Sequence, residues 1–469
     1  MPFQGGFPSS LIIVSANKIF NMKNMDTKNY QAYALHNYRQ IPQIANLPQH
    51  EIDAIEVVGR VLPFKSNNYV VDELIDWSNV PDDPIFTLTF PRRQMLDKKH
   101  FLHVQRLMEA GIPDKELKRE IDKIRLHLNP NPAGQEHNVP MLGDVKLKGV
   151  QHKYRETVLF FPSQGQTCHA YCTFCFRWPQ FSGMAGYKFA MKEGELLLNY
   201  LRLHKNVTDI LFTGGDPMIV SASVLAGYIE PLLTPEFSHI RTIRIGTKSL
   251  AYWPYRFLTD ADSDDMIRLF ERIVKAGKNL SVQAHFNHPV ELSTEAVKKA
   301  IGRIRSTGAQ IRTQSPLLRH INDSPEIWAD MWRKQVDLGC IPYYMFIARD
   351  TGAKHFFELP LERCWQIFRR AYRSVSGICR TVRGPSMSDT PGKVQVLGVS
   401  EANGEKVFVL RFLQGRDPKW VDVPFFAKYD PKATWFDQLE PAFGEEKFFF
   451  ESDRKFGKVL QDSSLNLFE

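Results

Sequence analysis

The sequence predicts an α/β fold whose central part is a partial (β/α)6 barrel, and three observations support this prediction. From residue 157 onward, short apolar runs alternate with amphipathic helical patterns, which is typical of parallel strands joined by helices. Six such runs can be counted, two fewer than a closed eight-unit barrel requires. The chain has 469 residues, of which 43% are hydrophobic, so it can bury a core of this size.

The expected strands are the six apolar runs at residues 157–162, 209–213, 242–247, 280–286, 310–315 and 342–348. Two of the helices between them have recognisable starts. Ser263 precedes an amphipathic helix over residues 264–278, and Ser324-Pro325 begins a helix that extends to Leu338. The alternation of strand and helix therefore continues to the last expected strand.

The barrel, residues 151–393, is expected to lie between two flanking segments. Residues 1–150 form a helical N-terminal accessory segment with proline-rich connectors and one long helical pattern over residues 93–128. Residues 394–469 contain alternating apolar and polar positions, for example at 406–411, and many aromatic residues. We expect this C-terminal segment to cover the barrel and not to fold by itself.

Composition and charge argue against several classes of protein. The net charge of +8 is spread over the chain and is not gathered into a Lys/Arg block, so no nucleic acid partner is required. No apolar run approaches the ~20 residues of a transmembrane helix, so no membrane partner is expected. The N-terminus lacks the basic region of a signal peptide. We therefore expect a cytoplasmic protein.

Three of the six cysteines, Cys168, Cys172 and Cys175, lie within eight residues in the pattern C-x3-C-x2-C. Three thiolates do not complete a tetrahedral zinc site, and the alternative to be tested is zinc with His169 as the fourth ligand. Three thiolates do suit a 4Fe-4S cluster, because its fourth iron stays open to chelate S-adenosylmethionine. Reductive cleavage of that cofactor yields a 5′-deoxyadenosyl radical. In radical SAM proteins the residue at the position of Phe174 packs near the adenine.

A glycine turn ends the second expected strand, in the sequence Leu-Phe-Thr-Gly-Gly-Asp-Pro over residues 211–217. Glycines at the carboxyl end of a parallel strand let the backbone approach a ligand. Taken alone, the turn is equally an ordinary strand-to-helix loop. After a C-x3-C-x2-C loop, it indicates the turn that radical SAM proteins place against the methionine amino group, formed here by Gly214, Gly215 and Asp216.

These motifs and several others resemble the lysine 2,3-aminomutase family over most of the chain. The cysteine loop with Arg177 and the Gly-Gly-Asp turn match in the family's order, as do residues 79–84 (NVPDDP), 152–154 (HKY), 244–247 (RIGT), 285–289 (HFNHP), 314–315 (QS), 317–319 (LLR), 322–323 (ND) and 342–344 (PYY). The resemblance implies a radical SAM isomerase with a partial barrel. In that family the adenosyl radical abstracts a substrate hydrogen, and an amine linked to pyridoxal phosphate migrates between neighbouring carbons.

The resemblance also implies cofactors, partners and residue roles. The cofactors are a 4Fe-4S cluster, S-adenosylmethionine and pyridoxal 5′-phosphate, and the partners are a small-molecule amino acid and an electron donor such as flavodoxin or ferredoxin. A homo-oligomer is compatible with it. The three cysteines would bind the cluster, and Arg177 would hold the substrate carboxylate, for which a guanidinium fork is suited. Further cofactor-binding positions are Tyr154, Phe174, Gly214, Gly215, Asp216, Thr247, His285 and Gln314. The alternatives are that His285 and His288 are core histidines and that Gln314 is a polar strand end.

The match changes at the lysine expected to bind pyridoxal phosphate. The family has four glycines before that lysine, whereas this chain has a single one, Gly392, before Lys393. Lys393 is still the candidate, because a lysine in a dry pocket has a lowered pKa and acts as a nucleophile. The alternative is that Lys393 is a solvated turn residue. The basic phosphate-binding residues of the family are represented by Lys153 and Arg155, but Thr157 replaces an arginine.

Substrate recognition is also predicted to differ. Where lysine-specific members have an aspartate that receives the distal ammonium of lysine, this chain has Arg349, followed by Asp350. Like charges repel in a low dielectric, so lysine is disfavoured and an amino acid with an acidic or polar side chain is expected. One alternative is that Asp350 neutralises Arg349 locally. The other is that a shift of one residue in the loop 348–354 turns Asp350 inward, where it takes the family aspartate's place. Asp389 is the second acidic contact that is retained.

Two classes of function agree with the sequence. The first is an aminomutase-like radical SAM enzyme that acts on an amino acid. The second is a pyridoxal-independent radical SAM enzyme that performs dehydrogenation or elimination on a different substrate. A non-enzymatic iron-sulfur protein is less favoured, because the glycine turn and Arg177 would then have no role.

Overall fold

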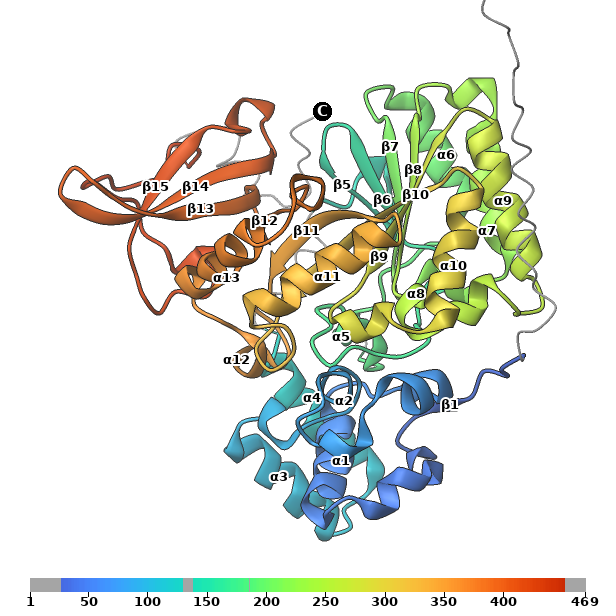
Figure 1. Ribbon diagram of the computed structural model, residues 1–469, viewed down its shortest axis with the longest axis vertical. Helices are drawn as coiled ribbons and strands as arrows, with labels where there is room; N and C mark the ends of the chain where they lie inside the picture. Colours follow the sequence, from blue (N-terminus) through green and yellow to red (C-terminus); the bar gives the residue numbers. More distant parts are fainter. Residues whose placement is uncertain (1–26, 130–137, 185, 452–469) are drawn as a thin grey trace, which may run out of the picture.

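The computed structural model describes residues 27–129, 138–184 and 186–451. Its centre is an 11-stranded sheet with the order β15-β14-β13-β12-β11-β10-β9-β8-β7-β6-β5 (Figure 1). Neighbouring strands from β6 to β12 are parallel. The strands at both edges, β5 on one side and β13 to β15 on the other, run antiparallel to their neighbours. The fold is therefore α/β with a large mixed sheet.

All six predicted strands are confirmed, and they lie side by side in chain order. They are β6 (Thr157–Phe160), β7 (Asp209–Phe212), β8 (Thr242–Thr247), β9 (Asn279–His285), β10 (Gln310–Leu317) and β11 (Ile341–Ile347). A seventh parallel strand, β12 (Arg383–Ser388), follows β11. The sequence did not indicate β12, because Gly384 and Pro385 interrupt its pattern and a glycine or proline argues against a central strand.

Helices separate the parallel strands and cover the outer side of the sheet (Figure 1). The predicted helix start at Ser324-Pro325 is confirmed, whereas Ser263 does not precede its helix but is the first residue of it and gives no side-chain cap. The hydroxyl of Ser324 accepts a hydrogen bond from the backbone N–H of Ile327 at 3.4 Å and so caps its helix. These helices are α5 (Trp178–Phe181), α6 (Gly194–Leu203), α7 (Ala222–Ile229), α8 (Ser249–Tyr252), α9 (Ser263–Lys275), α10 (Glu295–Ser306), α11 (Pro325–Asp337), α12 (Lys354–Phe357) and α13 (Leu361–Arg373).

The N-terminal helices gather at the lower end of the molecule in Figure 1. The prediction of one long helix over residues 93–128 is wrong, because the chain turns between two antiparallel packed helices. Gly111 adopts a φ of +62°, which favours glycine, and Pro113 then precedes the second helix. The elements here are β1 (Ala32–Tyr33), α1 (Gln49–Val61), β2 (Ser66–Asn67), α2 (Pro84–Thr89), α3 (Lys98–Glu109) and α4 (Asp114–His127).

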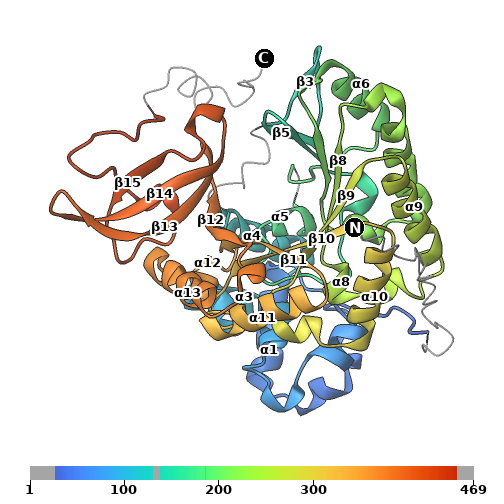
Figure 2. The same cartoon turned by 45° about the horizontal axis from the view of Figure 1, so that its top comes forward.

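The C-terminal strands continue the central sheet. The elements are β13 (Gly392–Ala402), β14 (Glu405–Gly415) and β15 (Pro424–Lys428), and β13 pairs with β12. The alternating run predicted at 406–411 lies within β14. Figure 2 shows these three strands projecting beyond the parallel ones. At the opposite edge, β5 (Val150–Tyr154) forms a hairpin with β6, and β3 (Met141–Leu142) pairs with β4 (Val145–Lys146).

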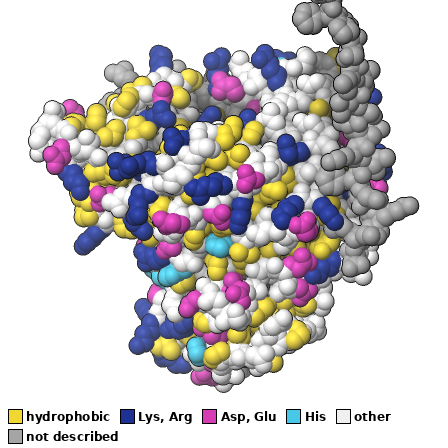
Figure 3. Space-filling model, viewed as in Figure 1, with side chains coloured by type: hydrophobic (Ala, Val, Ile, Leu, Met, Phe, Trp, Pro, Cys, Tyr) yellow, Lys and Arg dark blue, Asp and Glu magenta, His cyan; other side chains and the backbone are white. Residues whose placement is uncertain are grey.

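The surface agrees with the scattered charge of the sequence. Figure 3 shows acidic and basic side chains interspersed over one face. Within the described residues, no helix is both long and apolar enough to span a membrane. The stretch considered for a signal peptide belongs to residues 1–26, which lie outside the described residues.

Candidate active site

A cavity of about 780 Å³ lies at the carboxyl ends of the parallel strands. Its wall includes Thr213 after β7, Thr247 at the end of β8, His285 at the end of β9 and Ile347 at the end of β11. Ligands of parallel α/β folds bind at this edge, because the strand-to-helix loops meet there. The cavity is therefore the candidate active site.

The structure brings all predicted site residues to the wall of this one cavity. They come from β5, the cysteine loop, the ends of the parallel strands and β13: Tyr154, Cys168, Cys172, Phe174, Cys175, Arg177, Gly214, Gly215, Asp216, Thr247, His285, Gln314, Asp389 and Lys393. Their chemical roles remain predictions, but their convergence places all of them around a single cavity.

The cysteine loop, residues 168–175, is held by the N-terminal segment. The Lys65 ammonium donates to the backbone carbonyl of Cys168 at 2.7 Å, and the carbonyl of Lys65 accepts from the N–H of Tyr171 at 2.7 Å. The N–H of Thr173 donates to the carbonyl of Leu88 at 2.9 Å. These contacts could not be predicted from the sequence, because they join residues that are far apart in the chain. The loop therefore has a fixed backbone although it contains no helix or strand.

The three thiols fit an iron-sulfur cluster better than a single zinc ion. Among the described residues, no three His, Cys, Asp or Glu side chains converge closely enough to hold one metal ion. In a 4Fe-4S cluster each thiolate binds a different iron, so the thiolates need not converge on one point. The proposed fourth zinc ligand, His169, is also engaged elsewhere: its Nδ1 lies 2.8 Å from the Ser249 hydroxyl, and its ring stacks against Trp253.

Burial disfavours the thiolate form of the three cysteines. It raises the pKa of the Cys175 thiol to about 12 and also raises the pKa of Cys168 and Cys172. Ligand thiols must lose their protons to bind iron, so cluster binding would release protons. The positive charge of a bound metal centre would therefore have to offset the raised pKa values of these thiols.

The glycine turn after β7 packs directly on the chain that leads into the cysteine loop. A Cβ atom on Gly215 would lie 2.4 Å from the carbonyl oxygen of Thr167, which is too close for any side chain. Gly214 has a φ of +149°, and a Cβ atom there would lie 2.5 Å from Nε2 of Gln166. The N–H of Asp216 donates to the Thr167 carbonyl at 2.7 Å. The glycines are thus needed to join the two motifs.

Asp216 positions the turn with its buried carboxylate. This carboxylate accepts hydrogen bonds from the Thr247 hydroxyl at 2.7 Å, the backbone N–H of Lys248 at 2.8 Å and the Ser249 hydroxyl at 3.0 Å. Burial raises the pKa of Asp216, while these hydrogen bonds oppose the shift. Asp216 and Thr247 therefore form one network that ties the end of β7 to the end of β8.

The aromatic side of the cavity is formed by Phe174 and His285. Their rings lie nearly parallel, with an interplanar angle of 21° and centroids 6.2 Å apart. Burial lowers the pKa of His285 to about 3, so the imidazole is neutral. Gln314 lies beside His285 in the parallel register of β9 and β10. By contrast, His288 does not line the cavity and instead caps the turn Pro289–Leu292.

Arg177 presents an unsatisfied guanidinium to the cavity. Its Nη1 is buried and makes no hydrogen bond with the described part of the chain. The guanidinium carbon lies 4.4 Å from the ring centroid of Phe161 and 5.1 Å from that of Phe176. Burial lowers the pKa of Arg177 to about 10, so the group is charged at neutral pH. A buried charged fork without an acid partner is suited to bind a carboxylate.

Lys393 lies on β13 and its side chain lines the cavity, so it is not a solvated turn residue. Its ammonium nitrogen is 4.0 Å from the ring centroid of Tyr344. Burial lowers the pKa of Lys393 to about 7, so a large fraction is the nucleophilic free amine at neutral pH. The single glycine before it has a structural reason: a Cβ atom on Gly392 would lie 2.3 Å from the carbonyl oxygen of Gln414 on β14.

Charges of both signs lie at the predicted substrate end of the cavity. The Nε of Arg349 is 3.5 Å from a carboxylate oxygen of Asp350, and its Nη1 donates to the carbonyl of Ser388. The Asp389 carboxylate accepts from the N–H of Thr390 at 2.7 Å. Arg349 and Asp350 both line the cavity, and their contact agrees with the alternative in which Asp350 neutralises Arg349 locally.

The C-terminal segment adds wall residues that the sequence did not indicate, namely Gln414, Arg416, Trp435 and Asp437. The ring of Trp435 lies under the Arg349 guanidinium, with its centroid 5.1 Å away. Burial raises the pKa of Asp437, with further contributions from the Asp389 and Asp350 carboxylates. These residues lie in no recognisable motif, so only the folded chain shows that they belong to the site.

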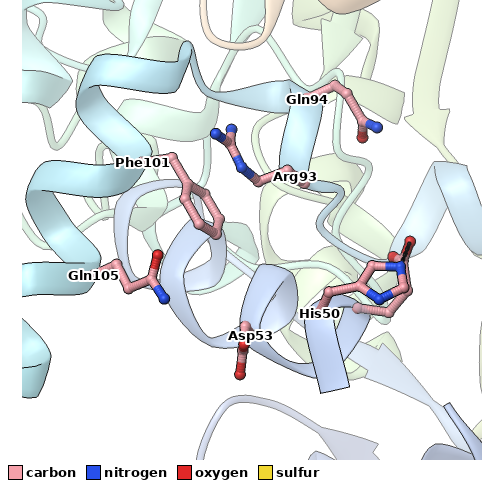
Figure 4. A pocket seen from close by; sticks show the side chains of 7 residues that line it. His50, Asp53, Arg93, Gln94, Phe101 and Gln105 are labelled. Atoms are coloured by element: carbon pink, nitrogen blue, oxygen red, sulfur yellow. Dashed lines mark ion pairs between the residues drawn. The ribbon is translucent and has the colours of Figure 1, made fainter. Parts of the chain in front are cut away.

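A second, smaller hollow of about 320 Å³ lies in the N-terminal segment (Figure 4). His50, Asp53, Arg93, Phe101 and Gln105 are among the side chains that surround it. None of the predicted site residues belongs to its wall. The chemistry inferred from the sequence is therefore confined to the large cavity.

Comparisons with known proteins support the sequence resemblance. A protein of Aquifex aeolicus named "Putative L-lysine 2,3-aminomutase" is 30% identical over 405 residues, which cover 86% of this chain and 95% of that protein. The L-lysine 2,3-aminomutase of Clostridium subterminale is 25% identical over 273 residues, 58% of this chain and 62% of that protein. The L-lysine 2,3-aminomutase of Escherichia coli is 27% identical over 282 residues, 58% and 74% of the two chains.

Two further comparisons contribute little. No protein-family model matches the sequence. A crystal structure of a radical SAM methyltransferase from Sphaerobacter thermophilus covers 60% of this chain and 92% of that chain at 15% identity, and its TM-score of 0.36 is too low to carry an argument. The match to the Aquifex aeolicus protein decides the assignment, because it covers most of both chains at 30% identity. This chain is a divergent member of the lysine 2,3-aminomutase family of radical SAM enzymes.

Proposed function

We propose that this enzyme moves an amino group between neighbouring carbons of an amino acid after radical abstraction of a hydrogen atom. The observation that carries the proposal is the convergence of the three cysteines, Arg177 and Lys393 on one cavity. When bound, the cluster with S-adenosylmethionine would supply the 5′-deoxyadenosyl radical, and pyridoxal phosphate would carry the migrating amine. The residues of the chain hold these groups and the substrate around one reacting position.

Two side chains have the charge states that this chemistry needs. Arg177 is protonated and has a buried N–H without a partner, so it would bind the α-carboxylate and fix the orientation of the amino acid. Lys393 has a pKa of about 7, so its free amine would react with the aldehyde of pyridoxal phosphate near neutral pH. The apolar wall formed by Phe174 would keep water from the reacting carbons.

We infer that the substrate side chain is polar or acidic and that lysine is a poor substrate. The buried Nε of Arg349 makes no hydrogen bond in the described chain, although it lies 3.5 Å from the Asp350 carboxylate. A polar substrate group that accepts a hydrogen bond would complete its contacts. Turnover of lysine, of glutamate and of their analogues would test this inference. Efficient conversion of lysine that is lost in Asp350→Asn and kept in Arg349→Ala would overturn it.

The pyridoxal-independent alternative is less favoured. Relatives over most of the chain are named aminomutases, and a lysine with a lowered pKa faces the cavity at the predicted place. Anaerobic incubation with pyridoxal phosphate, borohydride reduction and peptide mapping would decide between the two. We expect the label on Lys393 and its loss in Lys393→Ala. A label on another lysine would contradict the assignment, and active protein without any label would favour the alternative.

We further propose the organisation and surroundings of the enzyme. Six βα units in chain order, with helices on the outer side, support a partial (β/α)6 barrel over residues 151–393. Residues 1–150 would be its accessory segment, and residues 394–469 would cover the cavity, to which Arg416 and Asp437 contribute. A cytoplasmic location and reduction of the cluster by flavodoxin or ferredoxin would complete the reaction system.

A further inference from the structure

Three basic side chains hold the loop that precedes Lys393. Arg349 donates to the backbone carbonyl of Ser388, Lys153 donates to that of Asp389, and the Nε of Arg416 donates to that of Thr390 at 2.7 Å. The three side chains come from separate parts of the chain, and all three line the cavity. Positive charge is therefore concentrated around the segment that carries the candidate cofactor lysine.

The register of β13 and β14 places Arg416 close to Lys393. Lys393 pairs with Gln414, and Gly392 pairs with Gly415, so Arg416 follows directly. The N–H of Arg416 donates to the carbonyl of Pro391 at 3.0 Å, which extends the pairing by one step. Alternate residues of a strand share a face and lie roughly 7 Å apart along it. An anion held by Arg416 would thus lie within one small molecule's length of the Lys393 amine.

Arg416 is a buried cation and Lys153 a half-buried one, and neither forms an ion pair with a described acidic residue. Arg416 is only 5% exposed, and no carboxylate of the described residues lies within 4 Å of either side chain's nitrogen atoms. The second contact of the Arg416 guanidinium is neutral: Nη2 donates to Oδ1 of Asn138 at 2.6 Å. The hydrogen bonds leave Nη1 for a ligand. Two buried like charges are costly unless an anion lies between them.

The proximity of the two cations affects their protonation. Burial lowers the pKa of Lys153 well below its ordinary value, and the charge of Arg416 is the next largest cause. An anion between them would offset this repulsion and favour the protonated amine. Thr157, which stands where the family has an arginine, is engaged elsewhere, because its hydroxyl donates to the Asp209 carboxylate at 3.2 Å. Arg155, the other basic residue of this motif, is exposed and does not line the cavity, so Arg416 is the available second cation.

We propose that Arg416, together with Lys153, binds the phosphate group of pyridoxal phosphate. This inference rests on the proposed function, because it assigns the partner of the cofactor that Lys393 would hold. A phosphate monoester carries nearly two negative charges and three acceptor oxygens. It therefore matches two adjacent cations with free N–H groups better than a single carboxylate does. Arg416 thus makes the C-terminal segment a part of the cofactor site.

Binding of two aldehydes to the anaerobic, substrate-free protein would test this role. Pyridoxal phosphate and pyridoxal, which lacks the phosphate, would be titrated into wild type and Arg416→Gln, with the change in visible absorption as the readout. In Arg416→Gln we expect the dissociation constant of pyridoxal phosphate to rise on the order of 10- to 100-fold, because one charge-assisted hydrogen-bonding group is lost. The binding of pyridoxal should be unchanged. Inorganic phosphate should compete with pyridoxal phosphate in wild type and less in the variant.

Matched variants separate the charge of Arg416 from its structural role. Arg416→Lys keeps the charge but loses the fork, so we expect a smaller loss than in Arg416→Gln. Arg411 lies on the same strand outside the cavity wall, so Arg411→Gln should bind both aldehydes as wild type does. Equal weakening of both aldehydes in Arg416→Gln, or no weakening, would overturn the inference. Failure of wild type to bind either aldehyde would instead refute the proposed cofactor itself.

Discussion

Replacing Lys393 by methionine should stabilise the cofactor-free protein in a pH-dependent manner. In the folded chain the pKa of this lysine falls from its ordinary value of 10.5 to about 7, chiefly through burial. At about 1.4 kcal/mol for each pH unit, the cost of burying the ammonium is at most about 5 kcal/mol. The side chain is partly open to the cavity, so solvent screening reduces this cost, and we expect roughly half of the upper limit.

The sign of the pH dependence follows from the direction of this pKa change. Below pH 7 the lysine is protonated in both the folded and the unfolded chain, so the wild type pays the full cost. As the pH rises from 7 toward 10.5, the folded chain holds the neutral amine, and the cost fades when the unfolded lysine also loses its proton. The stabilisation by Lys393→Met should therefore be largest at and below pH 7 and should shrink toward pH 10.

Denaturant unfolding followed by circular dichroism, from about pH 6 to about pH 10, would measure the difference between variant and wild type. Lys419 is an exposed lysine of the C-terminal segment, and Lys419→Met serves as the matched control. Its difference from wild type should not follow the same course. A Lys393→Met difference that stays constant over this pH range would refute the buried, neutral amine, and with it the reason for choosing Lys393 as the nucleophile.

Three further predictions concern the other parts of the cavity. Changing any one of the three cluster cysteines to alanine should abolish formation of 5′-deoxyadenosine from S-adenosylmethionine, and its formation by the triple variant would show that the assignment is wrong. Gly215→Ala should weaken S-adenosylmethionine binding at least on the order of 10-fold, because the added Cβ atom would meet the Thr167 backbone. Gly227→Ala serves as the control: a Cβ atom at Gly227 has open space around it, so this variant should bind S-adenosylmethionine normally. Arg177→Lys should raise KM for the amino acid on the order of 10- to 100-fold, and an unchanged KM would argue against the carboxylate contact.

The sequence predicted the elements and motifs whose signals are local. The parallel strands were recognised because each is a short apolar run that is followed by a helical pattern, in one case with a cap at Ser324. Gly111 and Pro113 mark the split between α3 and α4. It was missed because the amphipathic pattern continues on both sides of them. Candidate residues within motifs were found because they are close together in the sequence, and short spacing restricts how far apart they can lie in the folded chain.

The residues that escaped prediction depend on pairing between distant segments. Arg416 reaches the cavity because Gly392 and Gly415 let β13 and β14 approach closely, and no local pattern encodes that register. Asp437 lies there because the chain returns after β15 to the end of β11 and β12. Arg349 and Asp350 could be identified from the sequence alone. Arg416 and Asp437, which also line the cavity, could therefore be identified only from the fold.

The contacts between the N-terminal segment and the cysteine loop have a consequence for biosynthesis. Lys65 and Leu88, which fix the loop backbone, leave the ribosome before Cys168 does. Lys393 and Arg416 are among the last parts of the cavity to be made. Chains begin to fold from their N-terminal end during synthesis. The nascent chain can thus hold the backbone of its cysteine loop before the segment that carries Lys393 and Arg416 has been made.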